Sequence, residues 1–122
     1  SITGNAKNVF TTSISSSTWI IVSVVFNKSG NQVFGRINGT TRTSIDSYLS
    51  SMDTNCIDLR MMRNRAGVKL DGRMAEYFHV AAIPGTGGTD ISDVEKAEGY
   101  LAHKWGLTGS LPLSHPYKNS AP

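Results

Sequence analysis

The stretch SDVEKAEGYLAHKWGL, residues 92–107, decides the fold around it because it has the pattern of a short amphipathic helix. Ser92 and Glu95 have the spacing of a capping box, in which each side chain satisfies a backbone amide at the helix start. One apolar face recurs at helical spacing and consists of Val94, Ala97, Leu101 and Trp105. Gly106 suits the left-handed conformation that ends many helices. The sequence therefore predicts a helix over residues 92–105.

Gly99 lies inside this predicted helix, where a glycine costs about 1 kcal/mol relative to alanine. A glycine at such a position indicates that another part of the chain packs closely against the helix backbone. We expect that neighbour to be a strand or the C-terminal tail.

Upstream of this helix, short apolar runs alternate with turn signals. TWIIVSVVF, residues 18–26, is apolar on both faces, which predicts a central strand that is covered on both sides. Asn38-Gly39 suits the two positive-φ positions of a type I′ turn and predicts a hairpin over residues 33–45. Two further strands are predicted at residues 57–61 and about 73–83. Short strands without intervening helices favour antiparallel β layers.

Three segments in this order resemble the C-terminal part of laminin-G-like, concanavalin A-like lectin domains of the bacterial and bacteriophage type. They are DGRMAEYFHVAAI at residues 71–83, the helix segment, and LPLSHPYK at residues 111–118. The resemblance covers roughly residues 17–118. It implies an all-β fold, an antiparallel jelly-roll sandwich with one short C-terminal helix.

The domain organisation that follows is an N-terminal arm or edge strand over residues 1–17 and a sandwich over residues 18–122 that includes the helix 92–105. The N-terminal strands of a complete family sandwich have no counterpart in the sequence. Either the arm replaces them, or a partner chain or a removed segment completes the sheets. An incomplete sheet leaves an edge at which another chain can pair.

The resemblance implies a non-catalytic recognition or attachment module on a larger extracellular or virion assembly. Its expected partner is a glycan or a cell-surface polymer. The alternative is a bacteriophage structural protein, for capsid decoration, cement or tail, that uses the sandwich for contacts between subunits. Neighbouring protein subunits are expected partners in either case.

The glutamates distinguish this chain from the glucanases that share the implied fold. A retaining glycosidase needs two carboxyl groups about 5–5.5 Å apart. Glu76 stands alone on its predicted strand, and Glu95 and Glu98 belong to the predicted helix. No GxSxG motif for a serine nucleophile is present either. We therefore expect no enzymatic activity.

The polar loop after the predicted hairpin is the predicted ligand site. Tyr48 offers an aromatic face to a sugar, while Asp46, Asp53 and Asn55 offer acceptors for hydroxyl groups. These oxygens are also of the type that calcium binds, but the loop has no closely spaced run of aspartates. No cofactor is expected, and calcium is the weaker alternative.

Composition excludes several other partners. The net charge of the 122 residues is only +3, and the basic stretch of residues 60–73 contains Asp71 and has no interleaved aromatic residues, so we expect no nucleic acid. No run approaches the roughly 18 apolar residues that cross a bilayer, so no membrane partner is expected. Cys56 is the only cysteine and excludes an internal disulfide.

The histidines and large aromatic residues have expected structural roles. No zinc spacing links the three histidines His79, His103 and His115, so no metal site is predicted. His103 and His115 lie in the AHKW and SHPY motifs of the resemblance, where hydrogen bonds between helix and tail are expected. Trp19 and Trp105 are expected in the core, and Tyr117 is expected to anchor the tail.

Overall fold

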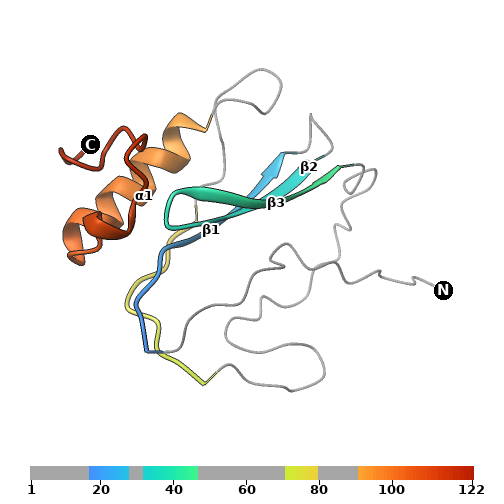
Figure 1. Ribbon diagram of the computed structural model, residues 1–122. Coiled ribbons are helices and arrows are strands. Elements are labelled where there is room, and N and C mark those ends of the chain that lie inside the picture. The colour runs from blue at the N-terminus through green and yellow to red at the C-terminus, as the bar shows by residue number, and fades with distance from the viewer. Residues whose placement is uncertain (1–16, 28–31, 47–70, 80–90) are drawn as a thin grey trace. The chain divides into compact units, whose positions relative to one another are not determined.

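The computed structural model describes residues 17–27, 32–46, 71–79 and 91–122 (Figure 1). The chain divides into two compact units, one formed by Ser1–Ser50 with Ile83–Pro122 and the other by Ser51–Ala82. The described helices and strands all belong to the first unit. None of the helices in these residues is long and apolar enough to cross a membrane.

The sheet has three antiparallel strands in the spatial order β1-β2-β3, with β1 at Val22–Asn27, β2 at Gln32–Ile37 and β3 at Thr40–Asp46. Ser23 pairs with Arg36 in the β1–β2 ladder, so both side chains lie on the same face. The register between β2 and β3 shifts at Gly35 and Arg36. The β-branched residues of β1 suit the extended backbone of a strand. In the strand order, β2 is the central strand.

The turn between β2 and β3 confirms the hairpin that Asn38-Gly39 predicts. Both residues have positive φ, at 49° for Asn38 and 77° for Gly39. Asn38 also holds the start of β1, because its side-chain Oδ1 accepts the N–H of Ile21 at 2.9 Å. Its own N–H donates to the carbonyl of Ile21, also at 2.9 Å. The hairpin turn is thereby tied to the residue that precedes β1.

Helix α1 spans Ser92–Lys104 and confirms the predicted helix, but it begins differently from the prediction. Ile91 is the N-cap, without a side-chain capping bond, and its carbonyl accepts the N–H of Glu95 at 2.9 Å. A capping box with Ser92 as the cap is therefore wrong. The Glu95 carboxylate lies 3.7 Å from Nη2 of Arg36, which shows that this glutamate faces the sheet.

The C-terminal end of α1 agrees with the prediction. Trp105 is the C-cap, and Gly106 follows with φ of 68°. The N–H of Leu107 donates back to the carbonyl of Ala102 at 2.7 Å, which is the long bond of a Schellman motif. A short 3-10 helix, η1 at Thr108–Ser110, then leads into the tail.

The tail folds back along α1 (Figure 1). Leu111 joins a small buried cluster with Ile21 and Ala102, against which Leu101 and Leu107 pack. The Lys118 ammonium donates to the carbonyls of Thr108 at 3.1 Å and Leu111 at 2.5 Å. One small core is therefore shared by the residue before β1, the helix α1 and the tail.

The predicted jelly-roll sandwich is wrong. The described residues form a three-stranded antiparallel sheet and one helix. The sheet face that carries Ser23 and Arg36 contacts Glu98 of α1, where a sandwich would place a second sheet. Strand β1 also differs from the prediction of a central, doubly covered strand, since it lies at the edge of the described sheet and Val22 and Val24 are exposed.

The strand predicted over about residues 73–83 is also wrong in the part that the structure describes, residues 73–79. Residues 71–79 belong to no strand, and Met74, Tyr77 and Phe78 are exposed. Alternating apolar residues give a segment the pattern of a strand, but a strand forms only when a neighbour accepts and donates its backbone hydrogen bonds. The predicted strand at 57–61, residues 80–83 and the arm up to residue 16 lie outside the described residues.

Candidate functional site

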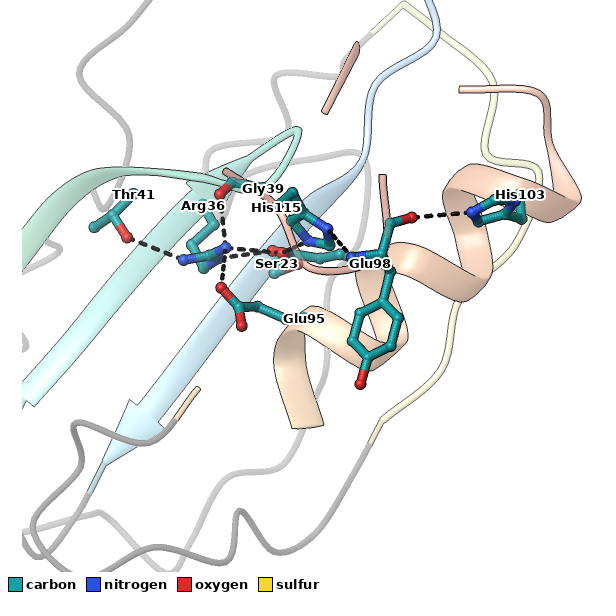
Figure 2. A network of polar contacts seen from close by, with 9 residues as sticks. Ser23, Arg36, Gly39, Thr41, Glu95, Glu98, His103 and His115 are labelled. Atoms are coloured by element: carbon teal, nitrogen blue, oxygen red, sulfur yellow. Dashed lines mark hydrogen bonds and ion pairs between the residues drawn. The ribbon is translucent and has the colours of Figure 1, made fainter. Parts of the chain in front are cut away.

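The most concentrated polar cluster of the described residues lies between the sheet and α1 (Figure 2). Arg36 of β2 donates from Nε to Oε1 of Glu98 at 2.8 Å and from Nη2 to Oε2 at 2.9 Å. These two bonds make a bidentate ion pair, the strongest geometry for arginine and carboxylate. Both side chains are almost completely buried, at 4% exposure for Arg36 and 1% for Glu98.

Two more groups donate to Glu98. The Ser23 hydroxyl of β1 donates to Oε1 at 2.9 Å, and Nε2 of His115 in the tail lies 3.3 Å from Oε2. A carboxylate has about four acceptor positions, and four donors meet this one. Ser23, Arg36, Glu98 and His115 form what we call the buried network.

The hydrogen bonds around His115 assign its tautomer. The N–H of Tyr117 donates to Nδ1 of His115 at 3.2 Å, so Nδ1 is the acceptor nitrogen. Nε2 therefore carries the hydrogen and donates to Glu98. The neutral ring satisfies both neighbours in this arrangement, and the negative charge of Glu98 is balanced by Arg36 alone.

The other side of the Arg36 guanidinium holds the hairpin. Nη2 donates to the carbonyl of Gly39 at 2.6 Å, and Nη1 donates to the Thr41 hydroxyl at 3.3 Å. Glu95, which is partly exposed, adds a second carboxylate at 3.7 Å. One side chain thus connects the turn and β3 to two successive turns of the helix, as Figure 2 shows.

Two glycines allow the tail to reach the network. A Cβ at Gly39 would lie 2.7 Å from Cδ2 of His115, and a Cβ at Gly99 would lie 2.9 Å from Cγ of Tyr117 and closer still to its Cβ. The close packing predicted at Gly99 is confirmed, with the tail as the neighbour. Nε2 of His103 donates to the carbonyl of Tyr117 at 2.9 Å, so both predicted histidine bridges between helix and tail are confirmed.

The geometry of the buried network suits a structural role. A buried ion pair is stable only when its charges are completely paired, because desolvation of each ion is expensive. Glu98 meets that condition, and with its acceptor positions filled and 1% exposure it cannot approach a substrate. The network fixes how sheet, helix and tail fit together.

A second cluster lies on the other side of α1. Tyr100 follows Glu98 by two residues, which is about 200° around the helix. Lys104 donates from Nζ to the Tyr100 hydroxyl at 2.9 Å, and its ammonium lies 5.2 Å from the centroid of the Tyr100 ring and 5.7 Å from that of Trp105. Tyr100 is 44% exposed and Trp105 is 47% exposed. We call Tyr100, Lys104 and Trp105 the aromatic platform.

The platform corrects the prediction that both tryptophans lie in the core. Trp105 and Trp19 are each about half exposed. Trp105 has the spacing of the apolar face, but it is the C-cap residue, beyond the last helical position. Helical periodicity therefore does not place its side chain.

The predicted ligand loop stays a prediction. Asp46 is the last residue of β3 and pairs with Gln32, while its side chain lies outside the description. Tyr48, Asp53 and Asn55 lie outside the described residues. Within the described ranges, no three His, Cys, Asp or Glu side chains gather in a way that could hold a metal ion.

Sequence reasoning missed the buried network because its members are far apart along the chain. Arg36 and Glu98 are separated by 62 residues, and Ser23 and Glu98 by 75. One signal was available, since Arg36 interrupts an otherwise mostly apolar strand and therefore needed a buried partner.

No family model, curated protein or solved structure matches this chain.

Proposed function

We propose that this chain is a non-catalytic recognition module that binds a glycan or a cell-surface polymer, outside the cell or on a virion. The exposed aromatic platform carries the proposal. Half-exposed aromatic rings offer apolar faces to the C–H groups of a sugar ring, and the neighbouring hydroxyl and ammonium groups suit its hydroxyl oxygens.

The position of the platform supports a binding role. Trp105 is held by the bond from its N–H to the carbonyl of Leu101 at 3.0 Å, and Gly106 and Leu107 close the helix end behind it. A site built on such a fixed element loses little conformational entropy when a ligand binds. The buried network, on the opposite side of the helix, holds α1 to the sheet.

The absence of catalysis is part of the proposal. Glu98 is a buried carboxylate, and its four donors leave it no role as base or nucleophile. The remaining carboxylates of α1, Asp93 and Glu95, contact Lys96 and Arg36.

Binding to a panel of glycans and cell-wall polymers tests the proposal. We expect the intact protein to retain at least one polymer, and the Tyr100→Ala/Trp105→Ala double variant to lose it. Trp19→Ala is the matched control, since Trp19 is also half exposed and lies outside the platform. If the intact protein binds nothing on the panel, or if the control loses as much binding as the double variant, the proposal is wrong.

A second candidate function is that of a subunit in a larger assembly such as a capsid or tail. The observation that favours it is strand β1, at the edge of the described sheet, with exposed Val22 and Val24 and with exposed Trp19 before it. An edge with apolar residues is suited to a neighbouring subunit. Sedimentation would decide: an oligomer that becomes monomeric in Val22→Lys/Val24→Lys supports this function, whereas a monomeric intact protein contradicts it.

A further inference from the structure

We propose that the tail, residues 111–118, is a pH-sensitive latch that opens when the ring of His115 takes up a second proton. The latch concerns the closure of the fold and does not depend on the proposed function. Two histidines connect the tail to helix α1, and they respond differently to a proton because their ring nitrogens face different groups.

Both ring nitrogens of His115 contact neighbours of fixed polarity. Nε2 donates to Oε2 of Glu98 at 3.3 Å, and Nδ1 accepts the N–H of Tyr117 at 3.2 Å. A protonated imidazole carries an N–H group at both positions and has no acceptor. The second proton would therefore place two donors against each other, at a side chain that is only 1% exposed.

The charge of the second proton also lacks a carboxylate of its own. Arg36 already binds both oxygens of Glu98, so an imidazolium would join an ion pair whose two charges cancel. The second carboxylate of α1 in this region, Glu95, lies 3.7 Å from Nη2 of Arg36. A buried ion without its own counter-ion is strongly disfavoured by desolvation.

The tail itself supplies no compensating negative charge. Its other titratable side chains are those of Tyr117, whose ring centroid lies 6.2 Å from that of His115, and Lys118, whose ammonium binds backbone carbonyls. The strand β1 contributes the Ser23 hydroxyl, which is uncharged and donates to Glu98. The docked tail is therefore suited to the neutral ring of His115.

His103 provides the contrast. Its Nε2 donates to the carbonyl of Tyr117 at 2.9 Å, and the residue is exposed. A carbonyl accepts the N–H of a neutral ring and of a protonated ring alike, and water can hydrate the second N–H. Protonation of His103 therefore keeps its bond to the tail, and acid breaks only the arrangement at His115.

The ion pair between sheet and helix does not depend on the latch. Ser23, Arg36 and Glu98 belong to β1, β2 and α1, and the bonds among them involve no atom of the tail. These bonds persist when the tail leaves, whereas Leu111 is withdrawn from the small core. Acid thus releases one segment and leaves the sheet joined to α1.

The direction of the effect follows from the number of bound protons. The docked form keeps Nδ1 of His115 unprotonated, whereas a hydrated imidazole takes up a proton within the range of about pH 5–8 in which histidines titrate. The open form therefore binds more protons in acid. For one linked proton, acidification favours opening by at most about tenfold per pH unit.

Hydrogen exchange of the intact protein between about pH 7.5 and about pH 5 tests the latch, with rates corrected for the intrinsic effect of pH. The tail amides are compared with those of the β2–β3 ladder, and nitrogen NMR follows protonation of the His115 ring in the same samples. His115→Asn keeps an acceptor near the position of Nδ1 and does not titrate. His103→Gln is the matched control, because it keeps a side-chain donor toward Tyr117 and also does not titrate.

We expect protection of the tail amides to fall in acid by up to about tenfold per pH unit, with the midpoint at which His115 is protonated, while the β2–β3 ladder stays protected. His103→Gln should keep this dependence, and His115→Asn should lose it. Tail amides that stay protected after His115 is protonated would overturn the proposal, and so would simultaneous loss of protection in tail and ladder. Where His115→Asn does not dock its tail at any pH, the intact protein decides, since separate midpoints for protonation and opening would also overturn it.

Discussion

Glu98 and Lys104 lie six residues apart on the same helix, and their charges are used in opposite ways. Glu98 is buried at 1% exposure among four donors. Lys104 is exposed and lies between two half-exposed rings. A buried charge contributes by specifying its partners, and its removal leaves those partners unpaired. An exposed charge contributes little to folding.

The largest change in stability is expected when the ion pair between Arg36 and Glu98 is broken. Glu98→Ala leaves the Arg36 guanidinium buried without its carboxylate, so we expect the free energy of unfolding to fall by about 3–5 kcal/mol. Urea denaturation of the intact protein and the variant measures the change. The Arg36→Met/Glu98→Leu double variant should lose less than Glu98→Ala, and an equal or greater loss would contradict the role of the unpaired cation.

The next effect concerns the contact that brings the tail to the network. Gly99→Ala places a Cβ against Tyr117, so overpacking should lower the free energy of unfolding by about 1–3 kcal/mol although alanine favours the helix. Thermal denaturation measures it. Gly109→Ala is the control, because a Cβ there meets nothing within 4 Å. A Gly99→Ala variant as stable as the Gly109 variant would show that tail and helix are not closely packed.

A smaller effect is expected from one of the four donors of Glu98. Ser23→Ala removes the hydroxyl that donates at 2.9 Å and leaves the charge pair in place, which should lower stability by about 1 kcal/mol. Combining Ser23→Ala with Glu98→Ala in a double-mutant cycle isolates the bond. Strictly additive losses would mean that the hydroxyl does not act through Glu98.

The smallest change in stability is expected for a substitution on the outer side of α1, at Lys104. Lys104→Met should change the free energy of unfolding by less than about 0.5 kcal/mol, since its contacts are at the surface. Urea denaturation under the conditions used for the Glu98 variant provides the comparison. A loss comparable to that of Glu98→Ala would show that the platform belongs to the folding core and would erase the contrast between the two sides.

The features that could be predicted from sequence are those with local causes. Asn38 and Gly39 form their turn because each tolerates positive φ, and Gly106 ends the helix for the same reason. Whether the chain forms a sandwich could not be predicted from local sequence patterns, because strand pairing depends on segments that are distant in the sequence. Residues 71–79, for example, have the alternating pattern of a strand but do not form one. The candidate sites were missed for related reasons. Arg36 meets a carboxylate 62 residues away, and Trp105 lies just beyond the helix whose period it continues.

The separation of Arg36 from Glu98 also has a consequence for biosynthesis. The ribosome delivers Ser23 and Arg36 first, and the growing chain must add 62 more residues before the carboxylate exists. Until then the guanidinium stays hydrated, since without its counter-ion it cannot leave water. Burial of this face of the sheet therefore depends on the segment from Glu98 to His115, which supplies the carboxylate and the imidazole that complete the network.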